Sequence, residues 1–161
     1  MRSITLRPIT QADLPFLFTV YAAARAEELA QVDWDEAQKL AFLASQFNAQ
    51  HHHYQTYYTT ASFNVIESDG QPAGRFYIDR WPSEIRIVDI ALLPSYRQLG
   101  IGSELLRQTQ AEGARTHKRV SIHVEKYNPA YRLYTRLGFK KIGETGVYDL
   151  LDWQPEQAHH V

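Results

Sequence analysis

Hydrophobic positions along the chain repeat with helical spacing in some segments and with strand spacing in others, and their order predicts a mixed α/β fold. Apolar residues three and four positions apart predict helices, whereas short apolar runs bounded by glycine, proline or aspartate predict strands. The predicted helices cover residues 13–29, 36–51, 100–114 and 129–137. The predicted strands cover residues 4–9, 61–67, 73–81, 85–93, 119–125, 139–143 and 147–153.

Local polar residues indicate where the first two helices begin and end. Thr10 has Asp13 three positions on, which resembles a capping box and opens the first helix. Asp33 or Asp35 would cap the second helix. The stretch of histidines and tyrosines over residues 51–58 is expected to end it.

The chain has 161 residues, which suits one domain, expected over residues 1–153. A short tail over residues 154–161, with His159 and His160, is expected to be frayed. The final predicted strand, 147–153, would finish the sheet or pair with a second copy in a homodimer. A composition of 44% hydrophobic and 22% charged residues is that of a globular protein.

Charge and cysteine content exclude several classes of protein. Lys and Arg number 17 against 18 Asp and Glu, a balance that argues against a nucleic-acid binder. Cysteine is absent, which excludes disulfide scaffolds, thiolate zinc sites and cysteine nucleophiles. No apolar run approaches the ~20 residues of a membrane span, and no signal core opens the chain. We therefore expect a cytoplasmic enzyme or binding domain without a membrane partner.

Residues 92–102 join the end of an apolar strand to the start of a helix at Gly100 and Gly102. Glycines let backbone N–H groups approach a ligand closely, and a helix N-terminus adds partial positive charge, so this turn suits a phosphate. Arg97 would add a full charge. A plain helix start has the same pattern, and the G-x-G-x-x-G loop is not present because its third glycine would fall on Leu105.

A second motif, Leu-Tyr-x-x-Leu-Gly-Phe at residues 133–139, follows the next strand and Asn128. Together with Pro-x-x-Arg-x-x-Gly-x-Gly at residues 94–102, it resembles the GNAT superfamily of acyl-CoA-dependent N-acyltransferases. The opening Leu-Arg-Pro-Ile-Thr at residues 6–10 is similar too, and the resemblance covers residues 3–153. It implies a central, mostly antiparallel sheet with flanking helices and two splayed parallel strands, between which acetyl-CoA enters.

The resemblance also implies a reaction and residues that perform it. An acetyl group would pass from acetyl-CoA to a primary amine by direct attack, without a metal. Main-chain amides of residues 98–102 would hold the pyrophosphate, the main chain around Leu92 and Leu93 would pair with pantetheine, and Tyr134 would protonate the departing thiolate. The expected coenzyme-binding residues are Leu92, Leu93, Arg97, Gln98, Leu99, Gly100, Ile101, Gly102, Ser103 and Asn128.

Asn128 departs from the usual spacing of the family. It precedes Tyr134 by six residues, where one residue more is common. Asn128 would contact the coenzyme or only cap the following helix, and the two roles are compatible. Asparagine before proline at a helix start is favourable capping chemistry by itself.

Two carboxylates are candidates for the general base that takes a proton from the amine. Asp89 interrupts strand 85–93, whose near-continuous apolar run predicts burial on both faces and a central position. A carboxylate withdrawn from water binds a proton more readily. The alternative is a buried salt bridge from Asp89 to an arginine such as Arg75 or Arg86. Glu84 is the weaker candidate because it is expected to be solvated.

Residues for the acceptor are expected on the first two helices, which the resemblance implies wall the acceptor site. Tyr21, Arg25 and Glu28 share one helical face. Arg25 would hold a carboxylate of the acceptor and Glu28 its amine, which favours a small amine or an amino-acid-like molecule. The alternative is a solvated face with an Arg25–Glu28 ion pair. Trp34 would line the same pocket or cover the core.

The remaining candidates carry weaker signals. Residues 51–53 are three adjacent histidines that point in different directions on a helix, so no metal site is expected. His123 and Glu125 share one strand face and would border the cleft, or His123 would make a structural hydrogen bond. Two other functions remain open: a non-catalytic acyl-CoA-binding regulatory module, and an acetyltransferase for a protein lysine or N-terminus.

Overall fold

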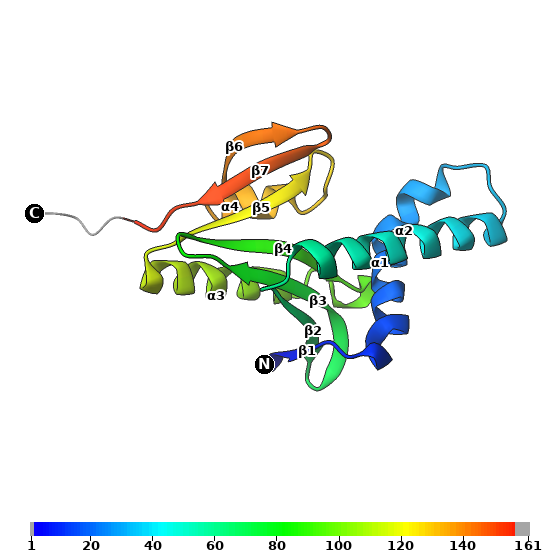
Figure 1. Cartoon of the computed structure of the whole chain (residues 1–161), viewed down its shortest axis with the longest axis horizontal. Helices are drawn as coiled ribbons and strands as arrows, with labels where there is room; N and C mark the ends of the chain where they lie inside the picture. Colours follow the sequence, from blue (N-terminus) through cyan, green and yellow to red (C-terminus); the bar gives the residue numbers. More distant parts are fainter. Residues whose placement is uncertain (1, 157–161) are drawn as a thin grey trace, which may run out of the picture. The chain divides into compact units, whose positions relative to one another are not determined.

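The computed structural model describes residues 2–156, and the mixed α/β class is confirmed (Figure 1). Seven strands hydrogen-bond in the order β1-β2-β3-β4-β5-β7-β6. The chain forms two compact units: Met1–Phe76 with Ile90–Arg97, and Tyr77–Asp89 with Gln98–Val161. His159 and His160 of the expected frayed tail lie outside the described residues.

The helices and strands follow the predicted order. The strands are β1 (Ile4–Pro8), β2 (Ser62–Ser68), β3 (Gln71–Arg80), β4 (Glu84–Leu92), β5 (Arg119–Glu125), β6 (Lys140–Thr145) and β7 (Tyr148–Trp153). The helices are α1 (Leu14–Ala30), α2 (Glu36–Tyr57), α3 (Ile101–Thr116) and α4 (Tyr131–Arg136), with short 3-10 turns η1 (Gln11–Asp13) and η2 (Pro94–Tyr96). No helix among residues 2–156 is long and apolar enough to cross a membrane.

In the first unit, α1 and α2 pack around a cluster of Leu17, Tyr21 and Phe47. The ring of Phe47 lies 5.8 Å from that of Tyr21, which fixes the two helices against each other. The predicted capping box forms at the start of η1, where Thr10 and the carboxylate of Asp13 satisfy each other's backbone N–H groups.

Helix α2 continues past the point where the sequence predicts its end. The carboxylate of Asp35 caps it by accepting the N–H of Gln38 at 2.8 Å. The helix ends within residues 51–58, as predicted, but only at Tyr57 and not near His51. Aromatic pairs one turn apart stabilise this stretch, as in His53 and Tyr57, whose rings lie 4.6 Å apart.

The second unit contains a parallel strand pair, β4 with β5. Residues 84–87 of β4 pair with residues 119–122 of β5, and α3 connects the two strands, as the predicted strand–helix–strand order requires. β5 pairs with β7, which also pairs with β6. β7 therefore has a neighbour on each side and offers no free edge for pairing with a second copy.

Only the first half of β4 is buried as predicted. Glu84, Ile85 and Ile87 are buried, whereas residues 88–92 are half-buried. The expectation of burial on both faces is wrong for this second half. The reason is that the pairing with β5 ends at Ile87 opposite Ile122, so the residues beyond lack that neighbour.

Candidate active site

The end of β4 is held tightly within the first unit. The N–H of Leu93 donates to the carbonyl of Ala73 at 2.8 Å. A Cβ placed on Gly74 would lie 2.1 Å from the carbonyl oxygen of Ala91, so only glycine permits this approach. Pro94 then begins the turn η2 that ends the strand, as predicted. The main chain around Leu92 and Leu93, the expected pantetheine site, is thereby fixed in place.

Arg97 follows this turn and is exposed, as expected for a residue that contributes charge to a phosphate site. Its Nε donates to the carbonyl of Leu92 at 3.0 Å. The side chain therefore folds back on the end of β4 and occupies one acceptor position of the main chain that was expected to pair with pantetheine.

Residues 98–103 belong to the second unit and lead into α3. Gln98 and Gly100 have positive φ angles of 61° and 84°, which turn the chain sharply before the helix. Within the described part of the chain no side chain caps α3, so the first N–H groups of the helix face outward without a helical partner. The other expected coenzyme residues here, Leu99, Ile101 and Ser103, lie in the same turn and first helical turn.

Gly102 shows that this helix start has room for a ligand. A Cβ placed there would meet nothing closer than a Leu133 side-chain carbon at 4.0 Å. Packing therefore does not require a glycine at this position, whereas the close approach of a phosphate would. Uncapped N–H groups with partial positive charge are also the donors that a phosphate needs. The residues present fit the pyrophosphate of coenzyme A.

Tyr134 and Asp89, the expected acid and base, come together in the second unit. The Tyr134 side chain is buried, with its ring 5.9 Å from that of Phe139. Burial raises the pKa of the Tyr134 hydroxyl, and the nearby Asp89 carboxylate raises it further. The phenol therefore keeps its proton at neutral pH. Asp89 itself is half-buried in β4.

Asn128 does not cap α4 itself, whose N-cap residue is Ala130, but its side chain holds the turn before the helix. Its Oδ1 accepts the N–H of Ala130 at 2.8 Å, and its carbonyl accepts the N–H of Tyr131 at 3.0 Å. Helix α4 begins at Tyr131, two residues after the predicted start at Pro129. Asn128 therefore holds the turn that leads into the helix carrying Tyr134.

The expected acceptor residues gather where α1 and α2 pack in the first unit. The guanidinium of Arg25 donates to the hydroxyl of Tyr21 and to the carboxylate of Glu28. The alternative of an intrahelical ion pair is therefore what the structure contains. Trp34 is 41% exposed and packs edge-on against Phe42 at 5.3 Å, so it covers this pair of helices.

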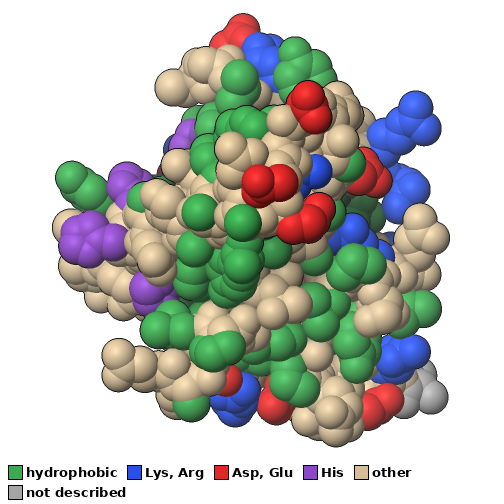
Figure 2. Space-filling model, turned by 90° about the vertical axis from the view of Figure 1, so that its right-hand side faces the viewer, with side chains coloured by type: hydrophobic (Ala, Val, Ile, Leu, Met, Phe, Trp, Pro, Cys, Tyr) green, Lys and Arg blue, Asp and Glu red, His purple; other side chains and the backbone are tan. Residues whose placement is uncertain are grey.

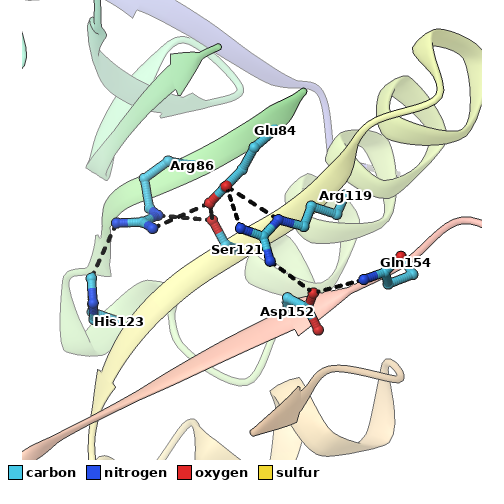
Figure 3. A network of polar contacts seen from close by, with 7 residues as sticks. All are labelled: Glu84, Arg86, Arg119, Ser121, His123, Asp152 and Gln154. Atoms are coloured by element: carbon cyan, nitrogen blue, oxygen red, sulfur yellow. Dashed lines mark hydrogen bonds and ion pairs between the residues drawn. The ribbon is translucent and has the colours of Figure 1, made fainter. Parts of the chain in front are cut away.

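A buried charged network, which the sequence analysis did not find, joins three strands of the second unit (Figure 3). The carboxylate of Glu84 on β4 accepts from Arg119 at 2.7 Å and from the hydroxyl of Ser121, both on β5. Arg86 donates to Glu84 at 3.2 Å and to Ser121 at 2.8 Å, and Arg119 reaches Asp152 on β7. The network links β4, β5 and β7 on one face of the sheet.

Glu84 is 6% exposed, so the expectation that it is solvated is wrong. Burial raises the pKa of Glu84, but the hydrogen bonds from Ser121 and Arg119 outweigh burial and hold it below its ordinary value. A carboxylate that stays ionised and fully hydrogen-bonded is a poor proton acceptor. The signal available in the sequence was alternation: polar residues occupy every second position in Glu-Ile-Arg of β4 and Arg-Val-Ser of β5.

Packing holds His51, and a hydrogen bond holds His123. His51 stacks on Phe47 at 5.9 Å, and Figure 2 shows histidine side chains on the surface of the face in view. His123 is 3.2 Å from the guanidinium of Arg86, the structural hydrogen bond expected as one alternative. Among residues 2–156 no group of three or more His, Asp or Glu is placed to hold a metal ion.

A family model for the GNAT acetyltransferases matches residues 23–139, which is more than half of the chain. The chain belongs to the GNAT acetyltransferase family. Several solved structures of this family have the same fold. An N-acetyltransferase of Thermoplasma acidophilum in complex with coenzyme A aligns with a TM-score of 0.70 and 17% identity, over 94% of this chain and 99% of that one.

Two further proteins are similar to this GNAT chain. A Corynebacterium glutamicum structure, described as histone acetyltransferase HPA2 and related acetyltransferase, aligns with a TM-score of 0.64 and 24% identity over 99% of both chains. A protein of Sulfurisphaera tokodaii named N-alpha-acetyltransferase is 30% identical over 97 residues. That match spans 51% of this chain and 58% of the relative.

Replacing Glu84 with glutamine should destabilise this GNAT protein by about 2 kcal/mol near neutral pH, because two arginines lose a buried charged partner. The pKa of Glu84 is lowered by folding, so its contribution is present above the ordinary glutamate pKa and is lost as the pH falls through the lowered value. Urea unfolding at about pH 7 and at about pH 3 should show the difference between wild type and Glu84→Gln shrinking in acid.

Glu27→Gln, on the exposed surface of α1, is the matched control and should change stability by less than about 0.5 kcal/mol. An equal loss in both variants, or a loss that does not depend on pH, would show that the Glu84 network does not hold the strands together.

Proposed function

We propose that this GNAT protein transfers an acetyl group from acetyl-CoA to a primary amine. The observation that carries the proposal is the meeting of a buried, protonated Tyr134 with the Asp89 carboxylate in the second unit. Family relatives support the coenzyme: the Thermoplasma acidophilum structure contains coenzyme A, and one from Elizabethkingia anophelis contains acetyl-CoA.

The coenzyme would be held by main-chain groups. The N–H groups at the start of α3, with the positive charge of Arg97, would bind the pyrophosphate, and the main chain of Leu92 and Leu93 would bind the pantetheine amides. The coenzyme supplies an acetyl thioester, whose C–S bond breaks as the new C–N bond forms. No protein nucleophile is needed, which agrees with the lack of cysteine.

Asp89 and Tyr134 then accept and donate the protons of the reaction. The ammonium form of the acceptor loses a proton to the Asp89 carboxylate, directly or through water, because only the free amine has a lone pair for attack. The hydroxyl of Tyr134 donates its proton to the sulfur that departs. The nitrogen releases its second proton as the amide forms, and this proton returns through water to the Tyr134 phenolate and restores the hydroxyl. Because burial raises the pKa of this hydroxyl, it carries its proton at neutral pH and can donate it.

The acceptor we propose is a small amine or an amino-acid-like molecule. The Tyr21, Arg25 and Glu28 cluster would bind it if the carboxylate and the amine of the acceptor replaced the Arg25–Glu28 ion pair. A second candidate is a protein N-terminus, which the name of the Sulfurisphaera tokodaii relative favours. A panel of free amino acids, simple amines, lysine peptides and free-N-terminus peptides distinguishes them. Acetyl-CoA binding without transfer to any amine would support the non-catalytic alternative.

Gly102→Glu should abolish acetyl-CoA binding measured by calorimetric titration, whereas the wild type should bind with micromolar affinity. The new side chain would fill the space beside the α3 N-terminus and bring a negative charge to the proposed phosphate site. Gly143→Glu on β6 is the control, because a Cβ there also meets no atom within 4 Å. Equal binding by both variants would place the pyrophosphate elsewhere.

Tyr134→Phe should lower the rate of acetyl transfer about 10–1000-fold, the range of a positioned general acid. The substitution keeps the ring contact with Phe139, so acetyl-CoA affinity and unfolding temperature should change little. Tyr127→Phe is the control, since that side chain is 87% exposed. A Tyr134→Phe enzyme with the wild-type rate would exclude the hydroxyl as the proton donor.

Asp89→Asn should reduce acetyl transfer while acetyl-CoA affinity stays nearly unchanged. The same variant should lower the pKa of Tyr134, because the negative charge that helps to raise it is removed. Steady-state kinetics and ultraviolet titration of the tyrosines measure the two effects, with the exposed Asp33→Asn as control. Unchanged turnover would remove Asp89 as the base even if the tyrosine pKa moved.

A further inference from the structure

A groove of about 540 Å³ opens in the first unit, and none of its lining residues belongs to the proposed acetyl-transfer site. Its walls come from the turn after β1, the C-terminal half of α2 and the start of β2. Side-chain amides of Gln11, Gln55 and Asn64 line it together with the apolar side chains of Leu14 and Phe63. A wall of this kind combines hydrogen-bonding groups with apolar surface, as small-molecule sites do.

The lining of the groove is uncharged. None of the residues that line it is Lys, Arg, Asp or Glu, and His51 is the one titratable group among them. Burial lowers the pKa of His51, and the positive charge of Arg75, which lies outside the lining, lowers it further. His51 is therefore neutral at physiological pH, with its ring plane fixed against Phe47.

The side-chain amide of Asn64 is not among the buried side-chain groups that lack a partner, so it keeps access to solvent where it lines the groove. The residue is 9% exposed, and its position in β2 is fixed by pairing with Pro8 of β1. In the part of the chain from residue 2 to 156, its side-chain amide forms no hydrogen bond, although the side chain lines the groove. The amide donor and acceptor of Asn64 are therefore available to a molecule in the groove.

We propose that this groove binds a small uncharged molecule that carries a carboxamide on an apolar body. The amide of Asn64 offers a donor and an acceptor side by side, the arrangement that pairs with another carboxamide. Gln55, exposed on the rim, offers a second such group, while Leu14 and Phe63 contact the apolar body. A charged ligand would lose its hydration without gaining a countercharge from the lining. The site is independent of the acetyl-transfer proposal.

The probe for this site is benzamide, compared with benzoate and benzamidine, which have nearly the same shape but carry a negative and a positive charge. The side-chain amide signals of Asn64 and Gln55 are followed by NMR during titration of the full-length protein. Benzamide should shift both signals saturably in the millimolar range, and each charged probe should bind at least tenfold more weakly.

The Asn64→Leu variant shows whether Asn64 binds a ligand or stabilises the fold. The variant should lose the benzamide-dependent shift of the Gln55 signal and yet unfold at the same or a higher temperature, because no internal hydrogen bond is lost. Gln55→Ala should weaken benzamide several-fold without affecting folding, because the side chain is exposed. Asn48→Leu, on the exposed surface of α2 and outside the groove, should leave binding unchanged.

Three results would overturn the proposal. Absence of a saturable shift with benzamide up to its solubility would show that the groove takes no such ligand. Equal or tighter binding of benzoate would show that the charge of Arg75 governs the groove and that its ligand is an anion. A lower unfolding temperature for Asn64→Leu would show that the amide stabilises the fold and is not held for a ligand.

Discussion

The Glu84 carboxylate is the interaction on which the parallel strand pair of the second unit depends. Parallel pairing is slightly weaker per residue than antiparallel pairing, and β4 and β5 pair over only residues 84–87 and 119–122. Glu84 binds Arg119 and Ser121 across this short ladder at its first position. Because a shift of one residue would place these charges against apolar neighbours, the buried network selects a single register.

That register sets the place of the catalytic candidates within the unit. Asp89 lies two residues beyond the last paired position of β4, so its location follows from where the pairing is fixed. The hydroxyl of Tyr131, the first residue of α4, donates a hydrogen bond to the carboxylate of Asp149 on β7 at 2.6 Å. This bond anchors the start of α4. Tyr134 follows about one helical turn later, so strand pairing at one end and this anchor at the other hold the acid near the base.

Local signals in the sequence were sufficient for the order of elements and for the turn at the coenzyme site. The Thr10 and Asp13 capping box and strand 119–125 appear where they were predicted, because adjacent residues determine them. The extension of α2 and the burial of Glu84 were not predictable in this way. The first depends on aromatic contacts such as His53 with Tyr57, and the second on a partner 35 residues away. Sequence spacing does not reveal such partners until the strand register is known.

The position of β7 between β5 and β6 has a consequence for synthesis on the ribosome. β6 leaves the ribosome before β7, yet β7 is the neighbour through which β6 joins the sheet. One edge of β5 likewise stays unpaired until β7 has been synthesised. Both strands therefore expose unpaired backbone groups until β7 emerges from the ribosome. Such exposed edges are binding sites for chaperones on the nascent chain.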